Sequence, residues 1–353
     1  MMEEMMEEMN RKEKPEKNGK IGFWGCLGIF GAGFFLFLAV SVVAICWSLS
    51  SCCASGLPDA EKRKAETEFL TGDPDSDSVI AVIDIRGTIL AEDEGFSARN
   101  NADPEKICAL IRGAAETPEV KAILIRLDTP GGEVTASDVI RRELEKCGKP
   151  VVAQMESMAA SGGYFIATSA RRIVANRSTM TGSIGVVIRT LNYHKLFRVL
   201  GLKECIYASG RMKAMLSGGK EVSSQEEKIV QALVMETFED FLQAVSAGRK
   251  IPMEKLRAAD FADGRILSGY QALNAGLVDR LGYFSDAVEE AEKLANIPAG
   301  SAKVVRYKSE SRLLDILASM TAPAKRLSVS LSGGVPEEFS MTPGKAYFLP
   351  AFP

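Results

Sequence analysis

Two stretches of this sequence carry side chains that are suited to nucleophilic chemistry. Ser161 lies between two alanines and two glycines in "MAASGGY", where a hydroxyl contributes little to packing. The residues before it, "PVVAQM", are typical of a buried strand, and "ASGGYFIATSA" is typical of a buried helix. At that junction Ser161 either caps the helix or acts as a nucleophile, with the N–H of Gly162 available to stabilise an oxyanion.

A serine nucleophile needs a base, and the sequence offers two. His194, the single histidine, lies in "TLNYHKLF" and would complete a site of the Ser-His kind. Lys213 lies among small and apolar residues in "ASGRMKAMLSGGK". Burial disfavours a charged ammonium, so a lysine removed from water can serve as a base. The residues alone leave both alternatives open.

A second corner of interest is "RLDTPGGEV", residues 126–134. A strand runs into Pro130, Gly131 and Gly132, and a helix follows. Adjacent glycines let the backbone approach a ligand closely, and their N–H groups can face an anion. Taken alone, the pattern is equally typical of a tight turn.

The composition excludes several classes of function. The chain has 353 residues, 46% of them apolar, and a formal net charge of -3, which gives no electrostatic case for nucleic acid as a partner. One histidine cannot form a multi-histidine metal site, and the seven cysteines show no CxxC spacing. We therefore expect structural or free thiols, no metal and no cofactor.

An uncharged segment near the N-terminus predicts a membrane anchor. Residues 21–47 carry no charge and exceed the roughly 20 residues that span a bilayer, and they are longer than a signal-peptide core. Five Lys or Arg precede this segment between Arg11 and Lys20, and three follow at 62–64. This bias predicts a cytoplasmic tail at 1–20 and an extracytoplasmic body. "LSSC", ending at Cys52, has the form of a lipobox, and either interpretation tethers the body to a membrane.

The remaining chain predicts an α/β body between a linker and a tail. Residues 48–76 are polar and read as a linker or an exposed helix, and the body extends over 77–320. Short β-branched segments alternate with helical ones, which predicts a largely parallel sheet. The expected strands are 79–85, 121–129, 150–155, 171–175, 184–188 and 204–208, and the expected helices are 104–116, 137–147, 192–201 and 224–249. Residues 321–353 are rich in Ser, Gly and Pro and predict a flexible tail.

These residues together resemble the signal peptide peptidase A family, bacterial membrane-anchored Ser/Lys proteases, in its short single-repeat form. The resemblance runs from Val79 to Gly282 and rests on "DTPGG", "SMAASGGYFIAT", "TGSIGV", "NYHKLF", "SGRMKAMLS" and "DGRILSGYQALNAGLVDRLG". It implies a Clp/crotonase-like spiral of ββα units. It also implies a homo-oligomeric ring or dome in which serine and lysine meet across a subunit boundary.

Carried over position by position, the resemblance implies a role for each candidate. Ser161 becomes the nucleophile, Lys213 the general base, and Ser183 of "TGS" the residue that orients Lys213. The oxyanion donors become the backbone N–H groups of Gly132 and Gly162. The implied activity is hydrolysis of remnant signal peptides and other apolar peptides through an acyl-enzyme. Most of the family places no histidine in the "NY-x-KL" helix, so the resemblance gives His194 no catalytic role.

Other interpretations remain alongside this one. A Clp-like Ser-His peptidase would use His194 as its base. A crotonase-like acyl-CoA enzyme would use the same paired N–H donors. A catalytically inactive scaffold that organises membrane partners would use none of these groups for chemistry. The tail adds a hypothesis of its own, because it ends in the apolar "YFLPAFP". In an enzyme that binds apolar extended peptides, this segment could occupy its own or a neighbour's groove as a product-like peptide.

Overall fold

The computed structural model describes residues 66–91, 101–308 and 347–348. All described residues belong to the second of two compact units, which begins at Lys64, and the fold of this unit follows. The predicted cytoplasmic tail and membrane segment, residues 1–47, lie outside the described residues. So do Cys52 and most of the predicted C-terminal tail. No helix within the described ranges is long and apolar enough to cross a membrane.

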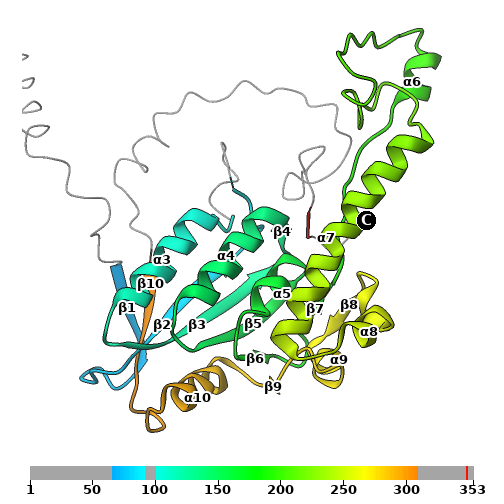
Figure 1. Ribbon diagram of the computed structural model, residues 1–353. Coiled ribbons are helices and arrows are strands. Elements are labelled where there is room, and N and C mark those ends of the chain that lie inside the picture. Colours follow the sequence, from blue (N-terminus) through cyan, green and yellow to red (C-terminus); the bar gives the residue numbers. More distant parts are fainter. Residues whose placement is uncertain (1–65, 92–100, 309–346, 349–353) are drawn as a thin grey trace, which may run out of the picture. The chain divides into compact units, whose positions relative to one another are not determined.

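The described elements alternate between strands and helices along most of the unit (Figure 1). The strands are β1 (Glu66–Gly72), β2 (Val79–Arg86), β3 (Val120–Thr129), β4 (Gly132–Glu133), β5 (Val151–Ala160), β6 (Arg172–Ala175), β7 (Met180–Gly182), β8 (Ile266–Ser268), β9 (Arg280–Leu281), β10 (Lys303–Lys308) and β11 (Tyr347–Phe348). The helices are α3 (Pro104–Glu116), α4 (Val134–Lys146), α5 (Gly162–Ala167), α6 (His194–Val199), α7 (Ser224–Arg249), α8 (Met253–Arg257), α9 (Gly269–Asn274) and α10 (Phe284–Ala295), with a 3₁₀ turn at Asp260–Ala262.

One mostly parallel sheet organises the unit. Its strand order is β1-β10-β2-β3-β5-β6-β9, and β7 pairs with both β5 and β8. Only the β1–β10 and β7–β8 pairs of this sheet are antiparallel among the described strands. In such a sheet the carboxyl ends of neighbouring parallel strands meet at one edge, where sites usually form. The predicted α/β class with a largely parallel sheet is therefore confirmed.

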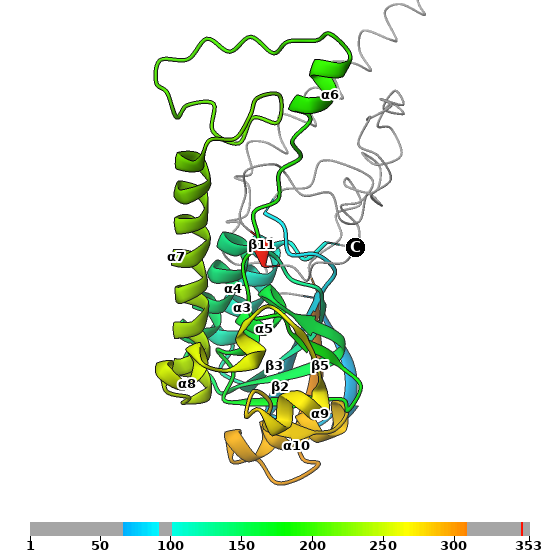
Figure 2. The ribbon, with the colours of Figure 1, turned by 90° about the vertical axis from the view of Figure 1, so that its right-hand side faces the viewer.

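Alternate residues of the central strands build two hydrophobic cores, one on each face of the sheet. Ile83 and Ile85 of β2 pack with residues of α3, α4, α5 and α7. Ile80 and Val82 of the same strand lie on the other face with Ala287 of α10. This period of two follows from the pleat of a strand, and burial on both faces explains why the strands read as continuous apolar runs. Figure 2 shows α10 on the side of the sheet away from α3 and α4.

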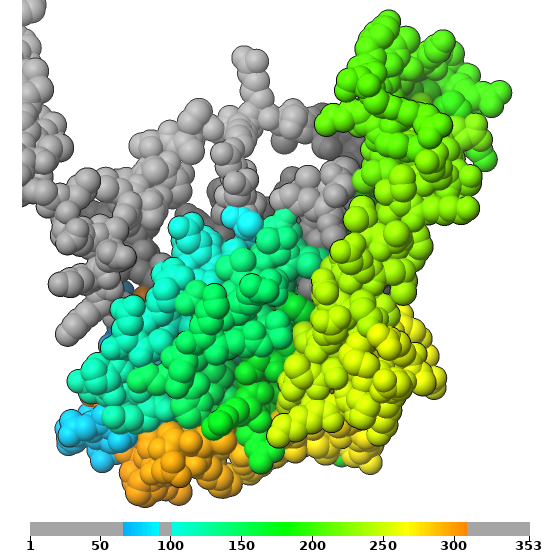
Figure 3. Space-filling model, viewed as in Figure 1, coloured from blue at the N-terminus to red at the C-terminus, as the bar shows by residue number. Residues whose placement is uncertain are grey.

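Residues 186–223, here called the arm, extend away from the sheet and return to the start of α7 (Figures 1 and 3). The strands expected at 184–188 and 204–208 fall at the base of the arm and within it. Neither forms a described strand, so both predictions are wrong. Their β-branched residues satisfy the local pattern, but a strand also needs a neighbouring strand for its hydrogen bonds. Within the described residues only an isolated bridge at Val187 forms in these two segments, and no strand pairs with either.

The other predicted elements lie close to their expected positions. Helix α7 covers the expected range 224–249, and its start is set by a capping box between Ser223 and Glu226. Strand β5 extends five residues beyond the expected end at Met155. Strand β1 pairs with β10 although it falls within the range predicted as a linker or exposed helix. Its residues are almost all exposed, so no apolar pattern marked it in the sequence.

Candidate active site

Ser161 lies where β5 ends and α5 begins, in a backbone conformation that few residues adopt. Its φ is 52° and its ψ is -112°, and strain of this kind is common where a strand-to-helix turn presents a nucleophile. Its N–H donates to the carbonyl of Gly182 at 2.9 Å, and its carbonyl accepts from Phe165 N–H at 2.8 Å. The backbone on both sides of Ser161 is therefore fixed.

The hydroxyl of Ser161 does not cap the helix that follows it. Within the described residues, the Oγ atom has no hydrogen-bond partner, although the residue is fully buried. A buried hydroxyl without a hydrogen-bond partner destabilises the folded state by on the order of 1–3 kcal/mol. Of the two interpretations open at the sequence level, helix capping is therefore wrong. The geometry favours a side chain kept free for another group.

Gly132 and Gly162 lie against one another beside Ser161. A Cβ atom added to Gly162 would lie 3.1 Å from the backbone nitrogen of Gly132 and 2.6 Å from Ser137 Oγ. A Cβ atom on Gly132 would lie 1.9 Å from the carbonyl oxygen of Ile89. Only glycine fits at either position. The structure thus brings the backbone of Gly132 against Gly162, the residue that directly follows Ser161.

Ser183 lies beside Ser161 through the segment that carries β7. Gly182, its neighbour, accepts the N–H of Ser161, and Thr181 Oγ1 donates to the carbonyl of Ala159 at 2.7 Å. Ser183 itself is buried, has a φ of 50° and donates its N–H to Arg265 O at 2.9 Å. The "TGS" segment is therefore held directly against the end of β5.

The structure does not bring Lys213 to this group. Lys213 lies in a turn of the arm, where its side chain is exposed and its N–H donates to Gly210 O at 3.0 Å. No described contact joins it to Ser161, and Figure 2 shows the arm projecting beyond the sheet. Within one chain the predicted nucleophile and the predicted base are thus carried by separate parts of the unit.

The C-terminal part of the arm is held to the start of α7 by polar contacts. The buried carboxylate of Glu226 pairs with Lys220 and also accepts the N–H of Ser223 at 3.0 Å. The hydrogen bond from Lys220, the bonds from Ser223 and the nearby charge together lower the pKa of Glu226 to about 2. His194 is part of the same region, since its Nδ1 lies 3.2 Å from Gly219 O. This contact places His194 in the arm and gives it no described contact with Ser161.

A short strand near the C-terminus pairs with the backbone of the PGG corner. Tyr347 and Phe348 form β11, which runs antiparallel to β4 with Phe348 opposite Gly132 and Tyr347 opposite Glu133. An exposed strand edge can bind an extended peptide through main-chain hydrogen bonds. The edge of β4 therefore offers such a docking position directly beside Gly132, which the sequence pattern alone did not reveal.

The cysteines within the described residues are free thiols. Burial raises the pKa of Cys108 to about 11, so its thiol stays protonated at neutral pH. A thiol that stays protonated is a poor nucleophile, so Cys108 does not compete with Ser161 for that role.

A strained, buried serine with an unpartnered hydroxyl at a strand-to-helix junction is typical of enzymes that use a serine nucleophile. Residues 143–298, which include Ser161 and Lys213, match the family described as Peptidase family S49. The chain is 31% identical over 276 residues to the Enterococcus faecium protein named signal peptide peptidase SppA, covering 72% of this chain and 79% of that protein. The chain belongs to peptidase family S49, and it is a serine protease.

Two longer relatives extend the comparison. Protease 4 of Haemophilus influenzae is 35% identical over 223 residues, 62% of this chain and 35% of that protein. The chloroplast serine protease SPPA of Arabidopsis thaliana is 31% identical over 287 residues, 80% of this chain and 42% of that protein. The chain thus spans less than half the length of each of these two proteins.

Proposed function

We propose that this protein is a membrane-anchored endopeptidase that hydrolyses remnant signal peptides and other apolar peptides with a Ser/Lys dyad. The observation that carries the proposal is the free hydroxyl of Ser161 beside the adjacent backbones of Gly132 and Gly162. The name of the enterococcal relative supports the substrate class. The uncharged segment at 21–47 supports the anchor and an extracytoplasmic catalytic body.

The proposed reaction assigns one step to each of these groups. Ser161 Oγ attacks the scissile carbonyl carbon while its proton passes to the neutral amine of Lys213. The N–H groups of Gly132 and Gly162 stabilise the negative oxygen of the tetrahedral intermediate. Lys213 then protonates the leaving amine, and water hydrolyses the ester bond to Ser161. Ser183, held against the end of β5, orients the amine of Lys213 in this scheme.

We infer that Lys213 reaches Ser161 from a neighbouring subunit. Apolar side chains on the arm are exposed in the single chain: Leu191 by 74%, Val199 by 83% and Tyr207 by 96%. Apolar surface of this kind marks a protein interface. A homo-oligomeric ring or dome, built on Clp/crotonase-like ββα spirals, would cover it. The same packing would remove Lys213 from water and bring it to the next subunit's serine.

The β11–β4 pair indicates how a peptide lies in the site. A substrate that replaces β11 would run antiparallel to β4, with its backbone beside Gly132. Main-chain pairing accepts many side chains, which suits an enzyme for varied apolar peptides. The C-terminal segment then acts as a product-like occupant of the groove, as its apolar sequence suggests.

A serine-directed fluorophosphonate probe tests the assignment of the dyad. We expect the probe to label Ser161 in the assembled protein, and to leave the Ser161→Ala and Lys213→Ala variants unlabelled. His194→Ala is the matched control and should label normally. Loss of labelling in His194→Ala with normal labelling in Lys213→Ala would instead support a Ser-His site. Turnover of acyl-CoA thioesters without peptide hydrolysis would support the crotonase-like alternative.

A further inference from the structure

Strand β5 changes its neighbour shortly before Ser161. Its first half pairs with β6, from Val152 to Met155, and its last three residues pair with β7, from Met158 to Ala160. On its other side, Met155 lies opposite Leu127 and Ala159 lies opposite Thr129. Three residues of β5, 156–158, therefore stand opposite one residue of β3, Asp128. This is a β-bulge, a feature that redirects a strand and often lies next to an active site.

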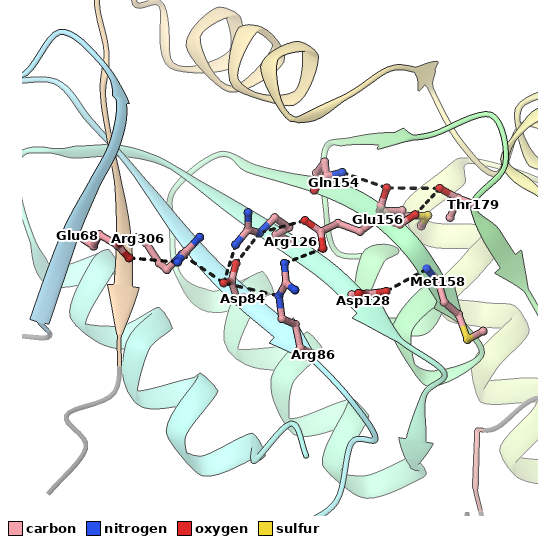
Figure 4. Close-up of polar contacts among 11 residues, drawn as sticks. Glu68, Asp84, Arg86, Arg126, Asp128, Gln154, Glu156, Met158, Thr179 and Arg306 are labelled. Carbon is pink, nitrogen blue, oxygen red and sulfur yellow. Dashed lines mark hydrogen bonds and ion pairs between the residues drawn. The ribbon is translucent and has the colours of Figure 1, made fainter. Parts of the chain in front are cut away.

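A bulge leaves backbone groups without ladder partners, and side chains of neighbouring segments supply them here (Figure 4). Asp128 Oδ1 accepts the N–H of Met158 at 3.2 Å. Thr179 Oγ1 donates to the carbonyl of Glu156 at 2.6 Å. Thr179 is almost fully buried, so its hydroxyl replaces a partner that water does not provide. Both ends of the bulge are thus satisfied by side chains from outside β5.

The side chain of Glu156 adds a third attachment on the sheet surface. Its carboxylate pairs with Arg86 at 2.7 Å and with Arg126 at 3.4 Å. These arginines come from β2 and β3, and Asp84 holds Arg126 in place through two hydrogen bonds of 2.7 Å. The bulge is therefore fixed from both neighbouring sides and on its own face.

The bulge sets the position of Ser161, because it allows β5 to end its pairing with β6 and to pair with β7 instead. From there Thr181 holds the carbonyl of Ala159, and Gly182 accepts the N–H of Ser161. Asp128 also lies in the segment that continues to Gly132, four residues later. The same carboxylate thus connects the strand that ends at the nucleophile with the corner that supplies an oxyanion donor.

We propose that Asp128 and Thr179 are positioning residues that set the distance between Ser161 and the Gly132 donor by stabilising the 156–158 bulge. This inference rests on the proposed role of Ser161. Neither side chain touches substrate in this scheme. A displacement of about 1 Å at a reacting group lowers the rate by up to roughly a hundredfold. The docking edge at β4 does not depend on the bulge, so peptide binding should be retained.

Two matched pairs of variants test the proposal in the full-length assembly. Asp128→Ala removes the acceptor of Met158 N–H, whereas Asp128→Asn keeps one. Thr179→Val removes the donor to Glu156, whereas Thr179→Ser keeps it. We expect the Ala and Val variants to lower kcat roughly ten- to a hundredfold with an almost unchanged KM. The Asn and Ser variants should retain most of the activity.

A remote control separates this effect from general destabilisation. Asp73 Oδ1 accepts the N–H of Asp75 at 3.0 Å in an exposed turn, so Asp73→Ala removes the same kind of bond far from the site and should leave kcat unchanged. Wild-type kcat in Asp128→Ala would overturn the proposal, as would an Asp128→Asn variant as slow as Asp128→Ala. If Asp128→Ala does not fold, equal kcat in Thr179→Val and Thr179→Ser overturns it. Full activity of Ser161→Ala would instead refute the proposed function.

Discussion

Two inactive variants should restore activity to one another if neighbouring subunits share each site. Ser161 lies in the body and Lys213 lies exposed on the arm, with no described contact between them. In an assembly of equal parts Ser161→Ala and Lys213→Ala subunits, a site works where an intact serine meets an intact lysine. In a closed ring with random order, half of the subunits carry an intact Ser161, and half of their neighbours carry an intact Lys213. About one quarter of wild-type activity should therefore return.

The assay co-expresses the two variants with different tags and purifies the mixed assemblies through both tags. Peptide hydrolysis is then measured per subunit, with each single variant as the inactive reference. Wild type mixed equally with the double variant provides a second measurement, since a shared site retains about one quarter of the activity and a site within one chain retains about one half. Zero activity in the first mixture and one half in the second would refute a shared site.

Three further predictions concern the groove, the oxyanion donors and the arm. A chain truncated after residue 340 lacks β11 and should hydrolyse short apolar peptides faster than the full chain, and an unchanged rate would count against groove occupancy. Gly162→Ala should lower kcat by roughly a hundredfold or more, because its Cβ would clash with Ser137 Oγ and crowd Gly132. Gly113→Ala, where a Cβ meets nothing within 4 Å, is its control. Because the pKa of Glu226 is lowered to about 2, its stabilisation of the arm is complete above the ordinary carboxyl range and is lost as pH falls towards 2. Limited proteolysis of the arm should therefore accelerate in acid for the wild type, and Glu226→Gln should already be susceptible at neutral pH.

Much of the fold could be predicted from the sequence because its signals are local. The buried strands read as apolar β-branched runs, and α7 begins where Ser223 and Glu226 form a capping box. The junction at Ser161 was also predictable, because small residues follow directly after a strand pattern. These signals depend only on residues that are close together in the sequence, so they can be read without knowing the fold.

The features that the sequence could not predict depend on distant partners. The bulge at 156–158 exists because Asp128 and Thr179, some 20 to 30 residues away along the chain, satisfy its backbone. The segment 204–208 has strand-like composition, but it pairs with no strand in the part of the chain that the structure describes. The β11–β4 pair joins segments more than 200 residues apart. Pattern analysis carries no information about such pairings.

In the proposed mechanism the body and the arm each carry one member of the catalytic dyad. The body fixes Ser161, Gly132 and Gly162 with hydrogen bonds and close contacts that leave no room for a Cβ atom. The arm holds Lys213 in water, and a lysine becomes an effective base only when it is removed from water. Packing of the arm on a neighbouring subunit would supply both the position and the burial in one step. Proteolytic activity would then depend on assembly, so that a newly made subunit stays inactive until its neighbours are in place.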